Sequence, residues 1–219
     1  PQKAAFFGCF LSGYLVHLYV FTNIIPNSDG LSRIFDPQQM TVSGRWFLHF
    51  ASYFNGFTQM PAVIGLFSVL FLALAAALAV SLLGIRSRAL SALSGALMAA
   101  FPAVGYTFLY LFTASAYCFA IFLAVLSVSL ARRGRWHWLA GCLLLACSMG
   151  TYQAYVTVAI GLSLLVIFRE TLDPSASFSA TLRLNHAEEK QMRDESMELL
   201  EMQGLAHLKD EIASSLPYG

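Results

Sequence analysis

The chain has 219 residues, of which 58% are hydrophobic and 11% are charged. Because soluble domains carry about 25% charged residues, this composition excludes an ordinary soluble domain and indicates an integral membrane protein. The formal net charge of +1 gives no reason to expect a nucleic-acid partner.

The charges are distributed unevenly. Residues 1–169 contain nine Lys or Arg and two Asp or Glu, whereas residues 170–219 contain four basic and ten acidic residues. The change predicts a transmembrane domain over residues 1–169 and a cytoplasmic acidic linker with a soluble helical tail over residues 170–219. In the tail, Leu182–Gln203 is predicted to be a helix that Gly204 ends. A solvated or self-associating tail is the preferred interpretation over a partner-binding one.

Six apolar segments come before the tail: Ala4–Thr22, Ala62–Leu83, Leu90–Phe112, Ala116–Ala131, His137–Met149 and Ala154–Phe168. About 20 apolar residues cross a bilayer, so the sequence predicts an all-α bundle of about six transmembrane spans. The last two segments are short, and two short helices or a hairpin that does not fully cross are the alternatives. In the third segment, Ser91, Gly95 and Ala99 favour close helix packing. Pro102 should kink or break that helix, with a re-entrant element as the alternative.

The basic residues predict the orientation of these spans. If the loop at residues 23–60 faces outward, the inner side carries seven Lys or Arg and the outer side carries two. The inner residues are Lys3, Arg86, Arg88, Arg132, Arg133, Arg135 and Arg169, and the outer residues are Arg33 and Arg45. This positive-inside bias favours an outward-facing loop.

The membrane domain has two acidic residues, Asp29 and Asp36, and both lie in this outward loop. Carboxylates near lipid are costly and are usually functional. A carboxylate at the bilayer edge can take a proton from a sugar hydroxyl as a general base. Asp29 is the stronger candidate for that base, with Asn27 as a polar neighbour, whereas Asp36 precedes a proline and is predicted to be a positioning group. A simple turn is the alternative explanation for these residue types.

Further candidates for substrate binding lie at the same side of the membrane. Arg33 and Arg45 are the two basic residues of the outward loop. The planar guanidinium of an arginine matches the geometry of phosphate. The alternatives are anchoring to lipid headgroups or pairing with the two carboxylates. Trp46 lies in the aromatic-rich segment Gly44–Phe54, which suits a helix in the membrane interface. His17 lies in the outer part of the first span, where either a functional role or helix packing is expected.

Tyr152, Gln153 and Tyr155 form a polar aromatic group between the fifth and sixth segments. Tyrosines at this depth often belong to the aromatic belt of a membrane protein. A sugar-binding platform built from aromatic faces is the alternative interpretation.

Four motifs together resemble a known family. They are Asn27-Ser-Asp-Gly30, Gly44-Arg-Trp46, Met60-Pro61 and Gly150-Thr-Tyr-Gln-Ala-Tyr155. In their order and topology they are similar to the bacterial and phage-borne O-antigen glucosyltransferases that change serotype, which are multi-span enzymes of the GT-C class. The resemblance covers about residues 4–168.

The resemblance implies a specific reaction. It implies an active site on the periplasmic side of the bacterial inner membrane and a glucose donor carried on undecaprenyl phosphate. It implies an O-antigen acceptor still attached to lipid, and inverting transfer without a metal or other cofactor. The class places its catalytic carboxylate in the first outward loop, which corresponds here to Asp29 or Asp36. Family members are longer, with further spans after the sixth, so the sequence is expected either to be truncated or to end in unrelated sequence.

Two other functions are compatible with a polytopic chain. A transporter or flippase component would place its polar groups near the bilayer midplane, whereas the polar residues here are concentrated at the outer end of the spans. A non-catalytic membrane subunit would instead work through the acidic tail. The glucosyltransferase is favoured because a phosphate-binding cation and a base occur in one outward loop.

Overall fold

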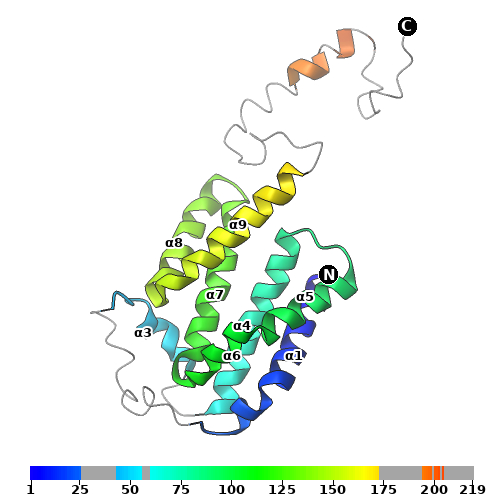
Figure 1. The fold of residues 1–219 in the computed structure, drawn as a ribbon. Coiled ribbons are helices and arrows are strands. Elements are labelled where there is room, and N and C mark those ends of the chain that lie inside the picture. Colours follow the sequence, from blue (N-terminus) through cyan, green and yellow to red (C-terminus); the bar gives the residue numbers. More distant parts are fainter. Residues whose placement is uncertain (26–42, 56–59, 173–193, 199, 203, 205–219) are drawn as a thin grey trace. The chain divides into compact units, whose positions relative to one another are not determined.

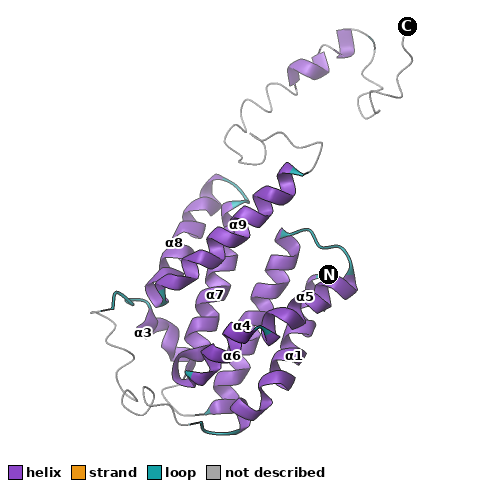
Figure 2. Ribbon diagram, in the orientation of Figure 1, coloured by secondary structure: helices purple, strands orange, loops and turns teal. Residues whose placement is uncertain are grey.

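The computed structural model describes residues 1–25, 43–55, 60–172, 194–198, 200–202 and 204. The described residues form helices and turns, without a β-strand. Contacts divide the chain into two units, residues 1–166 and residues 167–219. The candidate residues that the structure describes all lie in the first unit, whose helices are drawn in Figure 1 and Figure 2.

The helices follow one another with short connections. Their bounds are α1 (Gln2–Thr22), α3 (Leu48–Ala51), η1 (Ser52–Asn55), α4 (Pro61–Leu82), α5 (Arg88–Ala100), α6 (Pro102–Leu109), α7 (Leu111–Ala131), α8 (Arg135–Thr151), η2 (Gln153–Tyr155) and α9 (Val156–Thr171). Pro61 and Pro102 each begin a helix, where the missing backbone N–H costs nothing because it would have no helical partner.

Four of the described helical segments are long and apolar enough to cross a membrane: α1, α4, α7 and η2 with α9. The pair α5 and α6 would make a fifth span if it is counted as one, although it is bent by 41°. The six predicted spans are therefore not confirmed. The segment predicted at Leu90–Phe112 is two helices, since Pro102 cannot continue the hydrogen bonding of α5. Helix α8 has 17 residues and is not among the candidate spans.

Successive long helices run in opposite directions, so their connections alternate between two ends of the bundle (Figure 1). One end carries the end of α1, the start of α4, the short helix α3 and the α8–α9 junction. The opposite end carries the α4–α5 and α7–α8 connections, and therefore Arg86, Arg88, Arg132 and Arg133. This separation places Arg45 at the other end of the bundle from these four basic residues.

The contact between α1 and α5 depends on glycine. A Cβ on Gly8 would meet the carbonyl of Ala92, and a Cβ on Gly95 would meet the carbonyl of Ala5. Ser91, Gly95 and Ala99 are the buried residues of α5, so the predicted packing stripe of the third segment is confirmed. Small residues allow such close approach, which is how helices associate in lipid.

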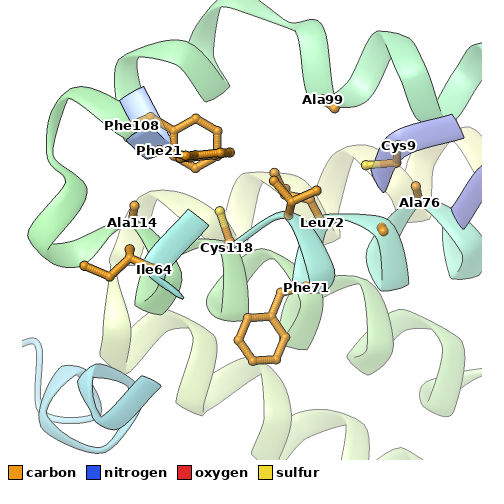
Figure 3. Close-up of a cluster of buried hydrophobic side chains, with 12 residues drawn as sticks. Cys9, Phe21, Ile64, Phe71, Leu72, Ala76, Ala99, Phe108, Ala114 and Cys118 are labelled. Atoms are coloured by element: carbon orange, nitrogen blue, oxygen red, sulfur yellow. The ribbon is translucent and has the colours of Figure 1, made fainter. Parts of the chain in front are cut away.

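The largest buried cluster of the described residues joins α1, α4, α5, α6 and α7. Figure 3 shows Phe21 of α1 lying against Phe108 of α6, with ring centroids 5.0 Å apart. Leu72 and Cys118 are also buried in this cluster. Because α6 contributes Phe108 to the same core as α1, the broken segment after Pro102 is packed as part of the bundle.

In the second unit, residues 194–198 and 200–202 are helical, and Gly204 follows them with a φ of 69°. Glycine adopts this left-handed conformation without a steric penalty and commonly ends a helix. The rest of the predicted tail helix lies outside the described residues. The cytoplasmic, soluble character of the tail stays a prediction, as does a domain boundary at residue 169.

Candidate functional site

Four side chains from three parts of the chain meet beside the α8–α9 junction. Arg45 comes just before α3, Tyr117 lies on α7, Tyr152 lies between α8 and η2, and Tyr155 ends η2. We call these four residues the Arg45 cluster. They are brought together because α7 and α8 are antiparallel neighbours and α3 packs on α7, with Leu48, Ala51 and Ala116 buried between them.

The guanidinium of Arg45 is held by two tyrosines. Its central carbon lies 4.7 Å from the centroid of the Tyr152 ring, in cation–π geometry. Its Nη1 donates to the hydroxyl of Tyr117 over 3.4 Å, a long hydrogen bond. The ring of Tyr117 lies 5.1 Å from that of Tyr152 and 6.0 Å from that of Tyr155. The Arg45 cluster is thus a guanidinium cation packed against neighbouring tyrosine rings.

The Nε donor of the Arg45 side chain has unusual surroundings. The Nε atom is buried, yet it has no hydrogen-bond partner among the described residues. Leaving a buried donor unsatisfied costs about 1–3 kcal/mol, and more for a charged group. Such an atom is a candidate for binding an acceptor from outside the described residues.

The backbone around Arg45 is fixed to the α8–η2 junction on both sides. The N–H of Phe47 donates to the carbonyl of Gly150 over 2.8 Å. The side-chain amide of Gln153 donates to the carbonyl of Ser43 over 2.9 Å. The predicted interfacial helix is therefore shorter than expected: it begins at Leu48, because residues 43–47 form turns held by these contacts.

A family model described as glucosyl transferase GtrII matches residues 18–185. The chain belongs to this family. The match covers all four residues of the Arg45 cluster, and it confirms the resemblance to serotype-converting O-antigen glucosyltransferases that the sequence motifs indicated. No curated protein and no solved structure matches the chain.

The family is one of glucosyltransferases, and the helices are apolar enough to cross a membrane. These two findings together indicate a membrane protein of the glycosyltransferase class. Of the residues predicted to bind substrate, the structure brings together Arg45, Tyr152, Tyr155 and Gln153. Trp46 lies beside them against Gly150, with 56% of its surface exposed. The catalytic candidates Asp29 and Asp36 lie outside the described residues.

Two further binding candidates, Asn27 and Arg33, also lie outside the described residues, so their roles stay predictions. Tyr117 was missed by sequence reasoning. Its position one residue inside the predicted fourth span, at the same end of the bundle as Tyr152, was the available signal. A tyrosine at a span end is so common that this signal alone does not single it out.

His17 lies elsewhere, on the face of α1 that packs against α5 and α6. It is 7% exposed, and its Nε2 lies 2.9 Å from the carbonyl oxygen of Ala99. A carbonyl can only accept, so Nε2 carries the proton. The His17 ring also packs against Phe108, with ring centroids 4.6 Å apart. These contacts fit the packing interpretation of His17, because the break after α5 leaves the Ala99 carbonyl in need of a donor.

Proposed function

We propose that the protein transfers glucose from undecaprenyl phosphate to a lipid-linked O-antigen unit, on the periplasmic side of the bacterial inner membrane. Membership of the GtrII family supports glucosyl transfer in a membrane protein. The observation that carries the proposal further is the buried Nε of Arg45, which has no hydrogen-bond partner in the described part of the chain. A donor with a phosphate at the membrane surface supplies the acceptor that this atom lacks.

A phosphate suits the Arg45 cluster better than a neutral sugar does. The guanidinium offers charged donors in a fixed plane, which matches the oxygens of phosphate. Tyr152 covers one face of the cation at 4.7 Å. An anion therefore meets the edge of the guanidinium, where its N–H groups point. The tyrosine rings beside it are suited to pack against the glucose or the first part of the lipid chain.

The chemical step requires a base, for which Asp29 is proposed. The carboxylate of Asp29 takes the proton of the acceptor hydroxyl as its oxygen forms a bond to C1 of glucose. The bond between C1 and the phosphate oxygen breaks with inversion, and undecaprenyl phosphate leaves. Arg45 then stabilises the charge that develops on the leaving phosphate. Asp36, Asn27 and Arg33 are proposed to position the two substrates, as is Gln153 beside the tyrosines.

The orientation follows from charge. The end of the bundle opposite Arg45 carries Arg86, Arg88, Arg132 and Arg133. Basic residues favour the cytoplasmic side, so the Arg45 cluster is proposed to face the periplasm. A maleimide that cannot cross the membrane should label a cysteine engineered at Ser43 in intact spheroplasts and leave one at Gly134 unlabelled. The reverse pattern would contradict the orientation.

The test of the function is initial glucosyl transfer by the intact enzyme in isolated membranes, at matched protein levels. Loss of a general base costs about 10²–10⁴ in rate, so Asp29→Asn should lower kcat by that factor, because the amide keeps the size and removes the basicity. Arg45→Ala should instead raise the KM for undecaprenyl-phosphate-linked glucose.

Each variant has an outcome that contradicts the proposal. If Asp36→Asn abolished transfer while Asp29→Asn left it near normal, the base would be Asp36. If both variants retained transfer, the enzymatic role of residues 23–60 would be wrong. An unchanged donor KM for Arg45→Ala would refute the phosphate-binding role of the Arg45 cluster.

A further inference from the structure

We propose that Gly150 and Gln153 are positioning residues, which hold the Arg45 guanidinium in the orientation that the donor phosphate requires. This inference rests on the proposed function of Arg45 and deepens it. Neither residue needs to touch the substrate for this role. They act through the backbone of residues 43–47, to which both are joined.

The first contact requires a glycine at position 150. A Cβ added to Gly150 would lie 2.5 Å from Cε2 and 2.6 Å from Nε1 of the Trp46 indole. Distances below 3.0 Å force an atom to move, and the indole is a rigid ring on the residue next to Arg45. Any side chain at position 150 should therefore displace the indole of Trp46 from its contact beside Arg45.

The carbonyl of Gly150 adds a hydrogen bond to the same contact. It lies in the last turn of α8, where carbonyls have no partner within the helix. The N–H of Phe47 donates to it over 2.8 Å. Residues 46 and 47 are thus held by close packing and by a backbone hydrogen bond at a single glycine.

The second contact holds the other side of Arg45. Gln153 donates to the carbonyl of Ser43 over 2.9 Å, between residues 110 positions apart in the chain. Gly44 follows with a φ of 70°, which glycine adopts without strain. A Cβ on Gly44 would lie 3.1 Å from the same Gln153 nitrogen. The backbone is therefore fixed on each side of Arg45, while Tyr152 stacks on its guanidinium.

Fixing the backbone in this way has a functional consequence. A long arginine side chain loses rotamer freedom when it binds an anion. A site that already holds the side chain loses less on binding, which is the basis of preorganisation. Displacements of about 1 Å can lower the rate about 10²-fold when they misplace groups that orient a substrate. The contacts of Gly150 and Gln153 with residues 43–47 should therefore strengthen donor binding.

The experiment measures kcat and the KM for undecaprenyl-phosphate-linked glucose in membranes, using the intact enzyme. Gly150→Ala should raise the donor KM about tenfold, the effect of a misplaced phosphate contact, with a smaller change in kcat. Gln153→Leu keeps the size of the side chain and removes its donor, so it should raise the donor KM in the same direction. The matched control is Gly161→Ala in α9, where an added Cβ meets nothing within 4 Å.

Double variants separate positioning from a merely structural role. If Gly150 acts through Arg45, adding Gly150→Ala to Arg45→Ala should change the donor KM little further, because the group that it positions is already absent. An equal effect of Gly150→Ala with and without Arg45 would overturn the inference. So would a normal donor KM for both Gly150→Ala and Gln153→Leu.

The failure of this inference is distinguishable from the failure of the proposed function. If Arg45→Ala raises the donor KM but neither Gly150→Ala nor Gln153→Leu does, only the positioning role is wrong. If Arg45→Ala itself leaves the donor KM unchanged, the phosphate-binding role is wrong, and the positioning role with it. If Gly150→Ala does not accumulate in membranes, the donor KM of Gln153→Leu alone tests the positioning role, since this substitution keeps the size of the side chain.

Discussion

His17 and Arg45 are both polar side chains that the sequence marked as candidates for substrate binding, but they differ in their hydrogen-bond partners. The His17 ring nitrogen is bonded to the Ala99 carbonyl inside the helix bundle. The Arg45 Nε is buried without a partner among the described residues. Buried polar groups in proteins are nearly always hydrogen-bonded. The bonded group is therefore explained by the fold alone, and the group that lacks a partner is the better candidate for binding a ligand.

The largest effect expected from this comparison concerns His17. His17→Phe keeps an aromatic ring and removes the donor to Ala99, which should lower the free energy of unfolding by about 1–3 kcal/mol. The donor KM of the remaining folded enzyme should not change. Thermal unfolding in detergent and donor KM check the two parts, with Tyr19→Phe on the exposed side of α1 as the control. A raised donor KM at normal stability would mean that His17 contacts substrate.

A smaller effect is expected when the aromatic face under Arg45 is removed. A cation–π contact contributes about 0.5–2 kcal/mol, so Tyr152→Leu should raise the donor KM about 2- to 30-fold. Tyr152→Phe keeps the ring and should remain close to normal. Tyr106→Leu, which alters a tyrosine that is 70% exposed, is the control. If the Phe variant lost as much as the Leu variant, the hydroxyl of Tyr152 rather than its ring would be the important group.

The smallest effect is expected at Tyr117. Its hydrogen bond from Arg45 is 3.4 Å long, at the weak end of hydrogen-bond geometry. Tyr117→Phe should therefore cost less than about 1 kcal/mol, a change of a few fold in donor KM. A loss as large as that of Arg45→Ala would show that Tyr117 binds the donor directly. Tyr106→Phe is the matched control.

Several features of the fold could be predicted because they depend on neighbouring residues. The break at Pro102 could be predicted because proline lacks a backbone N–H and cannot continue the hydrogen bonding of α5. The stripe of Ser91, Gly95 and Ala99 lies on one face of α5 because residues four apart share a face. Residues Arg45, Tyr152 and Gln153 could be assigned to one site since their segments end at the same side of the predicted membrane.

Other features were not predictable because they depend on contacts between distant parts of the chain. Whether residues 90–112 make one span depends on how α6 packs Phe108 against α1, not on its composition. The role of Gly150 appears only when Trp46 lies against it. The partner of His17 is a carbonyl 82 residues away.

The sequence by itself determined that this is an all-helical membrane protein, and it indicated the family, although the six predicted spans are not confirmed. Composition and local periodicity are sufficient for that, since the bilayer requires long apolar helices. Only the tertiary structure decided that the Nε of Arg45 lacks a hydrogen-bond partner among the described residues, while His17 has one. A side chain's hydrogen-bond partner is set by which helix packs beside it, and that packing is a property of the whole bundle.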